Sequence, residues 1–196
     1  MRDLETLLSM AAAHVVDDGL DYAGAKQKAA RALRHRGSLP DNEALEDAVR
    51  EHIAVFHAEE QPAELRALRQ LALVWMRRLQ PLRPHLAGAV WRGTATRRSA
   101  VMIDLYCDDP KAAELLLLDQ GLDFEAGPGG PTARGSDASD VLSLWVPCRA
   151  LGEHVMLHLW VRDLDDLRGA LKPDARGRSW RGDTEALSRL LDAEEL

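Results

Sequence analysis

The sequence has few of the residues that would identify a metal-binding, secreted or membrane protein. Only two of its 196 residues are cysteine, Cys107 and Cys148, and they form no CxxC pair. This argues against a structural zinc site and predicts two reduced, buried thiols. No apolar run reaches the roughly 18 residues that span a bilayer, and the first ten residues lack a signal-peptide pattern. We therefore expect a cytoplasmic protein with no membrane partner.

Positive charge is scarce overall and concentrated in one segment. The net charge is −7, which argues against indiscriminate binding of nucleic acid. Residues 62–98, however, hold eight arginines and one acidic residue, Glu64, so their local charge is +7 (eight minus one). RNA binding through this segment is the third and weakest of our hypotheses, and it predicts a steep salt dependence.

The first 80 residues carry apolar side chains at helical spacing. Helices are predicted for residues 3–17, for residues 22–34, for a third segment that starts at Asp41 or Asn42, and for a fourth that starts at Pro62. In the third helix, Leu45, Val49, Ile53 and Phe56 are expected to face inward. The fourth should end near QPLRP, because two prolines follow it.

After residue 85 the pattern changes to strands alternating with helices. Strands are predicted within HLAGAVW, AVMIDLYC, LDFEAG, VLSLWVPC and EHVMLHLWVRD, the last two as a hairpin around RALG. Helices are predicted within PKAAELLLLDQG, LDDLRGAL and TEALSRLLDAEEL, and loops at 128–140 and 172–183. The fold class is therefore α+β: a helical segment, 1–80, and a small mixed sheet flanked by helices, 81–196, which could form one compact unit.

The segment GAVWRGTATRRS, residues 88–99, combines two glycines with hydroxyl side chains and arginines just before a strand. Backbone N–H groups at glycines can approach an anion closely. Thr94, Thr96 and Ser99 offer hydroxyl donors, while Arg92, Arg97 and Arg98 supply positive charge. These features predict a phosphate-binding turn.

This segment and its strand resemble the opening motif of the polymerase-β-like nucleotidyltransferases. That motif has a Gly-Ser pair, a second glycine, a Ser-Asp pair and a strand that bears two aspartates one residue apart. Gly88 and Gly93 match the two glycines, and Ser99 matches the second serine. The resemblance covers residues 85–125 best and implies a nucleotidyltransferase-like core, a nucleotide or other phosphate ligand, and Mg²⁺ as cofactor.

The match departs from the motif at three positions. Ala89 stands in place of the first serine, and Ala100 and Met102 stand in place of the two aspartates. Asp104 follows two residues after Met102. Asp104 lies on the same strand face but ~6–7 Å further along. Taking Gly93-Thr94 as the Gly-Ser pair brings Asp104 nearer the first acidic position. If Asp104 is taken as that acid, Tyr106 stands at the second position. We take Asp104 as the candidate catalytic residue and metal ligand.

A single aspartate cannot organise two metal ions that are ~3.5–4 Å apart. Transfer activity is therefore expected to be weakened, altered or lost unless carboxylates elsewhere in the chain complete the site. The other interpretation of Asp104 is a hydrogen-bonded carboxylate at a sheet edge. A lone acid in VMIDLYC is costly to bury unless it is paired or bound to metal, which favours the functional interpretation.

A second hypothesis from another class is a non-enzymatic interaction module. Here the helical segment forms a homo-oligomer or binds a partner, and the degenerate core serves only as scaffold. In keeping with either hypothesis, Trp75, Trp91, Trp145 and Trp160 are expected in the core rather than in a base-stacking surface. The loop RGRSWRGD around Trp180 is expected to be exposed.

Overall fold

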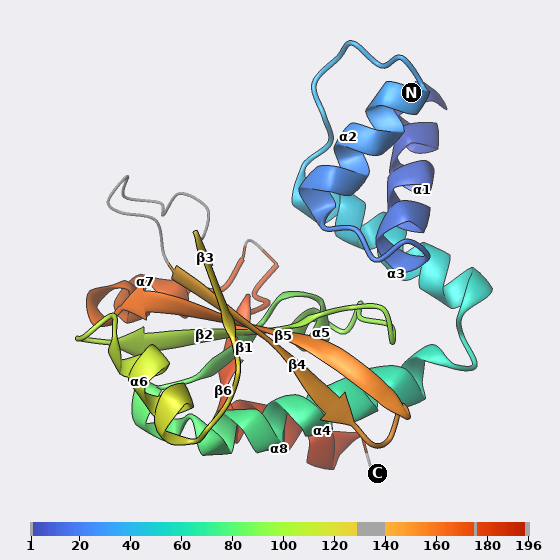
Figure 1. Cartoon of the computed structure of the whole chain (residues 1–196). Helices are drawn as coiled ribbons and strands as arrows, with labels where there is room; N and C mark the ends of the chain where they lie inside the picture. The colour runs from blue at the N-terminus through green and yellow to red at the C-terminus, as the bar shows by residue number, and fades with distance from the viewer. Residues whose placement is uncertain (1, 129–139, 175, 195–196) are drawn as a thin grey trace. The chain divides into compact units, whose positions relative to one another are not determined.

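The computed structural model describes residues 2–128, 140–174 and 176–194 (Figure 1). The chain is an α+β protein with one six-stranded mixed sheet, which confirms the expected fold class. It forms two compact units: residues 1–65 with 94–99, here called the helical unit, and residues 66–93 with 100–196, the sheet unit. The division falls after Leu65, within the fourth helix. Most of the predicted 128–140 loop lies outside the described residues.

The helical unit is built on three helices and the start of a fourth. Its helices are α1 (Arg2–Val16), α2 (Tyr22–Ala32), α3 (Asn42–Phe56) and the first residues of α4 (Gln61–Arg78). Asp21 and Asp41 accept hydrogen bonds from the backbone N–H groups of Gly24 and Ala44, and so cap α2 and α3. Because the apolar spacing is helical, one stripe of each helix is buried; its members include Leu7, Ala11, Ala25, Ala29, Leu45 and Val49.

Phe56 does not share in this core. It is the last residue of α3 and is 66% exposed, next to Val55, which is 70% exposed. The prediction that Phe56 faces inward is therefore wrong. Its ring instead packs on the imidazole of His52, with centroids 4.7 Å apart. Helical periodicity continues to the end of a helix, but burial in α3 ends at Ile53, which is 8% exposed, one turn before Phe56.

The sheet unit holds all six strands, in the order β3-β4-β5-β2-β1-β6. The strands are β1 (His85–Ala87), β2 (Val101–Cys107), β3 (Glu125–Pro128), β4 (Asp140–Cys148), β5 (Glu153–Asp163) and β6 (Arg181–Asp183). β2 and β5 are parallel, and the other neighbours are antiparallel. β4 and β5 form the predicted hairpin around RALG.

Helices cover one face of this sheet. Besides the rest of α4, the unit contains η1 (Gln80–Leu82), α5 (Gly88–Arg92), α6 (Ala112–Asp119), η2 (Leu164–Asp166), α7 (Leu167–Ala170) and α8 (Thr184–Ala193). Figure 1 shows α4 and α8 along the same side of the strands. Val155, Leu157, Leu159 and Val161 alternate along β5 as its buried set, as a strand with one covered face requires. Among the described residues, no helix is both long and apolar enough to cross a membrane.

Several side chains differ from the sequence-based expectation. Trp145 is 68% exposed, so its assignment to the core is wrong, whereas Trp75 is buried. The segment 172–183 is not simply an exposed loop, because Arg181–Asp183 pairs with β1 as an edge strand. A three-residue strand rich in charge has no alternating pattern long enough to reveal it. Cys107 and Cys148 are buried free thiols, as expected.

Candidate functional site

The second face of the sheet carries most of its polar side chains. The register pairs Asp104 with Trp160, Tyr106 with Arg162, and both Met102 and Ser143 with His158. Cross-strand partners share a face, so these seven residues form one surface, here called the polar sheet face. On β5 its members His158, Trp160 and Arg162 are half-buried, in contrast to the buried residues that alternate with them. This is the surface on which the sequence placed its candidate acid.

Asp104 lies at the centre of this face and is almost completely buried. Its Oδ1 accepts a 2.7 Å hydrogen bond from Nε of Arg162 on β5. Its Oδ2 lies 3.1 Å from Nε of Arg181 on β6, an ion pair whose alignment falls short of a hydrogen bond. A carboxylate left without such partners would be costly to bury. The two guanidinium groups therefore compensate for the burial of Asp104.

Tyr106 extends this cluster along β2. Its hydroxyl accepts a 2.8 Å hydrogen bond from Nη1 of Arg181, and the ring of His85 meets its ring edge-on, with centroids 5.2 Å apart. Burial, and then the negative charge of Asp104, raise the pKa of Tyr106 above its ordinary value, against the opposing charge of Arg181. Tyr106 therefore stays a neutral phenol and adds no negative charge to the site.

A magnesium centre at Asp104 does not fit these surroundings. Mg²⁺ needs several oxygen ligands in octahedral geometry, and both oxygens of Asp104 already face guanidinium groups. Within the described parts of the chain, Asp104 belongs to no group of three potential metal ligands. The arrangement instead matches the second interpretation in part: Asp104 is held by a hydrogen bond, but β2 lies inside the sheet rather than at its edge.

Gly88 and Gly93 bound a short helix rather than a single tight turn. β1 ends at Ala87 and α5 begins at Gly88, whose φ is +67° and whose missing Cβ would lie 2.9 Å from Sδ of Met102. Gly93, with φ +82°, ends α5 and donates its N–H to the carbonyl of Ala89. Both positions thus require glycine for the backbone path past β2, whether or not they bind phosphate.

Arg92 is buried and engaged inside the sheet unit. Its guanidinium lies 3.3 Å from Oδ2 of Asp174 and stacks over the ring of Trp180, 4.2 Å from the centroid. Burial alone would raise the pKa of Asp174. The backbone N–H groups of Arg178 and Arg176, together with the guanidinium groups of Arg178 and Arg92, outweigh burial, so the pKa is lowered. Trp180 is thus packed under an arginine rather than displayed on an exposed loop.

Residues 94–99 belong to the helical unit, where they pack on the start of α4. Gln61 donates a hydrogen bond to the carbonyl of Ala95, and the backbone N–H of Arg97 donates to Oε2 of Glu64 at 2.9 Å. The Ser99 hydroxyl accepts from the N–H of Thr96. The turn therefore holds an anion of its own, the Glu64 carboxylate, which a phosphate would have to displace.

The eight predicted site residues thus fall into two compact units. Gly88, Arg92, Gly93 and Asp104 belong to the sheet unit, and Thr94, Thr96, Arg97 and Ser99 to the helical unit. Thr94 and Thr96 are buried, and neither hydroxyl has a hydrogen-bond partner among the described residues.

Sequence reasoning missed Arg162. It noted Arg181 within RGRSWRGD, as a residue that could reach over a phosphate, but did not connect it with Asp104. The two are 58 and 77 residues from Asp104 in the chain, and only the parallel pairing of β2 with β5 and the edge pairing of β6 bring them to it. The alternation of LHLWVR does place Arg162 and Trp160 on the less buried side of a strand. That signal could have suggested a polar face but not its partner.

Comparison with known proteins supplies no relative. No model of a known protein family, no curated protein and no solved structure matches this chain.

Proposed function

We propose that this protein binds a phosphate-bearing ligand, a nucleotide in the first instance, on the polar sheet face, and that metal-dependent transfer at Asp104 has been lost. The proposal keeps the nucleotidyltransferase-like ancestry suggested by Gly88, Gly93 and Ser99 but moves the binding groups to Arg162 and Arg181. The observation that carries it is the buried Asp104 between two partly exposed guanidinium groups.

The charge balance of this cluster favours an anion. One carboxylate faces two guanidinium groups, so a net positive charge remains where the side chains of Arg162 and Arg181 are 25% and 22% exposed. Arginine binds phosphate in a fork geometry that suits this task. Because Asp104 engages the Nε atoms, the guanidinium planes are oriented before a ligand arrives, which reduces the entropy cost of binding.

An aromatic surface next to the arginines would suit a nucleobase. The guanidinium of Arg162 lies over the ring of Trp160, 5.5 Å from its centroid, and Trp160 is only half-buried. Stacking of a base on an aromatic ring contributes about 1–3 kcal/mol, which supports a nucleotide over inorganic phosphate.

The proposal is tested by calorimetric titration of the full chain with ATP, GTP, CTP and UTP, each with Mg²⁺ and again with EDTA. Binding of at least one nucleotide is expected, with similar affinity in both conditions, since the arginines rather than a metal hold the phosphates. Arg162→Gln and Arg181→Gln should each weaken binding by about 10-fold or more, because a charge-assisted bond contributes about 1.5–3 kcal/mol.

Arg149→Gln is the matched control, because Arg149 is an exposed arginine in the β4–β5 turn of the same unit. It should leave the affinity unchanged. If the folded protein gives no heat of binding with any of the four nucleotides, the proposal is refuted. Binding that vanishes in EDTA, or that survives both arginine substitutions, would also contradict it.

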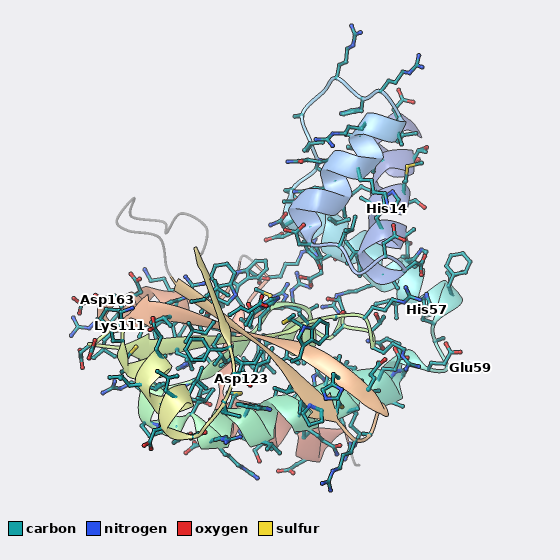
Figure 2. The ribbon with its side chains drawn as sticks, viewed as in Figure 1. His14, His57, Glu59, Lys111, Asp123 and Asp163 are labelled. Atoms are coloured by element: carbon teal, nitrogen blue, oxygen red, sulfur yellow. The ribbon has the colours of Figure 1, made fainter. Side chains whose placement is uncertain are left out.

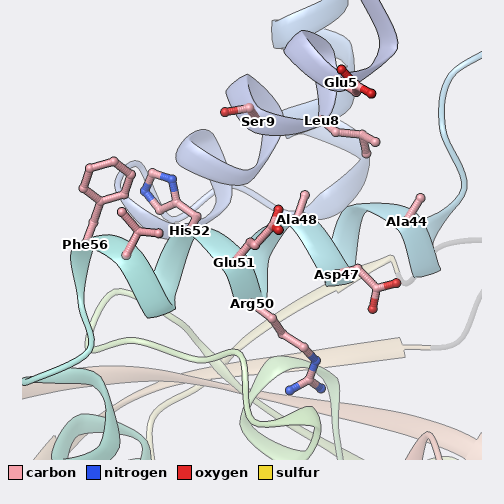
Figure 3. Close-up of a pocket in the computed structure, with 11 residues that line it drawn as sticks. Glu5, Leu8, Ser9, Ala44, Asp47, Ala48, Arg50, Glu51, His52 and Phe56 are labelled. Atoms are coloured by element: carbon pink, nitrogen blue, oxygen red, sulfur yellow. The ribbon is translucent and has the colours of Figure 1, made fainter. Parts of the chain in front are cut away.

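A second candidate, an interaction module, is favoured by a groove in the helical unit. A groove of about 870 Å³ runs between α1 and α3, and Figure 3 shows Leu8 and Phe56 on its walls with Glu5, Asp47 and Glu51 around them. Apolar side chains as exposed as Val55 and Phe56 are typical of contact surfaces. The acidic surroundings suit a basic partner, and the arginine-rich segment of a second copy of this chain is the partner we propose.

Self-association is tested by light scattering over a range of concentrations. A dimer that dissociates when Val55 and Phe56 are replaced by serine would support this candidate. A chain that stays monomeric at every concentration would exclude a second copy as the partner. Neither result bears on the nucleotide titration, so the two candidates are separable.

A further inference from the structure

Asp17, His52 and His57 bring three potential metal-ligand atoms together in the helical unit. Nε2 of His57 lies 3.0 Å from Oδ1 of Asp17, and Nε2 of His52 lies 3.3 Å from Oδ2. The ligand atoms of all three residues lie within 4.8 Å of one another. No other group of three such ligands occurs in the part of the chain that is described.

The helix ends create this arrangement. Asp17 directly follows α1, and its N–H continues the helical hydrogen bonding to Ala13. His52 lies in the last turns of α3, and His57 is its C-terminal cap, with φ −132° and ψ 18°. Figure 2 shows His57 at the end of that helix. The non-helical backbone at His57 lets two histidines five residues apart reach the same carboxylate.

The electrostatics of this position favour a cation. The C-terminal end of a helix carries a partial negative charge, and here α1 and α3 both end beside an aspartate. The neighbouring Asp18 is already engaged, since its Oδ2 contacts His14 and Lys28 at 2.7 and 2.8 Å. Asp17 is thus the carboxylate that faces the two histidines.

We propose that Asp17, His52 and His57 bind a divalent first-row transition ion, with Zn²⁺ as the reference case. Zinc takes nitrogen and oxygen ligands at ~2.0–2.2 Å, so neighbouring ligands of a tetrahedral ion lie roughly 3.3 Å apart. The observed 3.0 and 3.3 Å separations are close to that value. Three protein ligands leave the fourth position for water or another ligand.

The site would be open to solvent and would border the groove of the helical unit. The Asp17 and His57 side chains are 48% and 32% exposed, which provides an entry path. His52 is among the groove residues in Figure 3. Its Nε2 is buried without a hydrogen bond of good geometry and lies on the Asp17 side of the ring. A neutral imidazole ligates a metal through its unprotonated nitrogen, so both histidines would bind through Nε2 with the ring proton on Nδ1.

The test uses the full chain, freed of metal with EDTA and then titrated calorimetrically with Zn²⁺. Visible spectra with Co²⁺ report whether a four-coordinate site forms. One Zn²⁺ per chain is expected to bind tightly and to raise the unfolding temperature. His57→Gln and Asp17→Asn should each lower the affinity for this Zn²⁺ by about 100-fold or more. Even substitutions of residues that only contact a metal ligand lower metal affinity by ~10–100-fold.

His14→Gln is the matched control: it removes a histidine one turn away that also pairs with an aspartate, but not a proposed ligand. It should leave the tight binding of one Zn²⁺ per chain unchanged. If His57→Gln does not fold, Asp17→Asn and the Co²⁺ spectrum of the unaltered chain still give the answer. The proposal would be overturned if the unaltered chain bound no Zn²⁺ tightly, or if all three variants bound zinc with equal affinity. The three side chains would then be only a hydrogen-bonded link between helix ends.

Discussion

Asp104 on β2 and Arg162 on β5 are joined by a 2.7 Å hydrogen bond between Oδ1 and Nε. This bond links the two parallel strands at the middle of the sheet. It also means that Asp104, the one acid of β2, anchors an arginine in place of the metal expected from the sequence. The predictions below separate these two roles and test the packing around them.

Asp104→Asn distinguishes an anchor from a metal ligand. Loss of the buried charge should destabilise the fold by about 1–3 kcal/mol, the usual cost of breaking a charged hydrogen bond. Affinity for nucleotide should be retained or increased, because both arginines lose their internal counter-charge. Urea unfolding and calorimetry measure the two effects. Asp123→Asn, at an exposed position of the same unit, is the control. Loss of binding in Asp104→Asn together with loss of Mg²⁺ dependence would favour the metal-ligand role.

His158 should make stability fall in mildly acidic solution. Burial lowers its pKa below the usual value of 6.5, and the Ser143 hydroxyl lies 2.9 Å from its Nδ1. Below pH ~6.5 the unfolded chain takes up a proton that the folded chain resists, so the free energy of unfolding decreases as pH falls. Above that pH the contribution of His158 is fully present.

This effect is measured by urea unfolding between pH 5 and pH 8, values chosen to bracket the ordinary histidine pKa of ~6.5. His158→Gln should show a smaller decrease in stability on acidification than the unaltered chain. His154→Gln, at an exposed position on the same strand, should not. An identical pH profile for the unaltered chain and His158→Gln would contradict the assignment.

Gly182 leaves space for the indole of Trp91. A Cβ at this position on β6 would lie 2.1 Å from Cη2 of Trp91, whose ring nitrogen donates to the carbonyl of Ser179. Gly182→Ala should therefore destabilise the protein by about 1–3 kcal/mol, as overpacked sites do. Gly169→Ala, where the added carbon meets nothing within 4 Å, serves as control in thermal unfolding. Equal melting temperatures for the two variants would show that the indole moves at little cost.

Gly88 and Gly121 separate backbone strain from steric contact. Their φ angles are +67° and +65°, so alanine should cost about 1–2 kcal/mol at each from backbone strain. At Gly88 the new Cβ also lies 2.9 Å from Sδ of Met102, whereas Gly121 has open space. Gly88→Ala should therefore be the more destabilising substitution in denaturant unfolding. Equal losses would mean that Met102 moves freely and that Gly88 is needed only for its φ.

Local pattern by itself determined much of the fold. Three-and-four spacing located α1 to α4, the prolines ended α4, and the alternation of VLSLWVPC and EHVMLHLWVRD predicted the β4–β5 hairpin. These features rest on hydrogen bonds and burial among residues close in the chain, which is why periodicity reports them. The same locality explains why Phe56 was misplaced, because a helical pattern does not show where burial of the apolar stripe ends.

Tertiary structure alone decided what surrounds the candidate residues. The sequence placed Asp104 on the correct strand face, but its partners come from β5 and β6, and Asp17 meets His52 and His57 across about 35 to 40 residues of chain. Such contacts depend on strand order, register and the direction in which each helix ends. No short-range pattern encodes them, because their energy is gained only when distant segments have already been brought together.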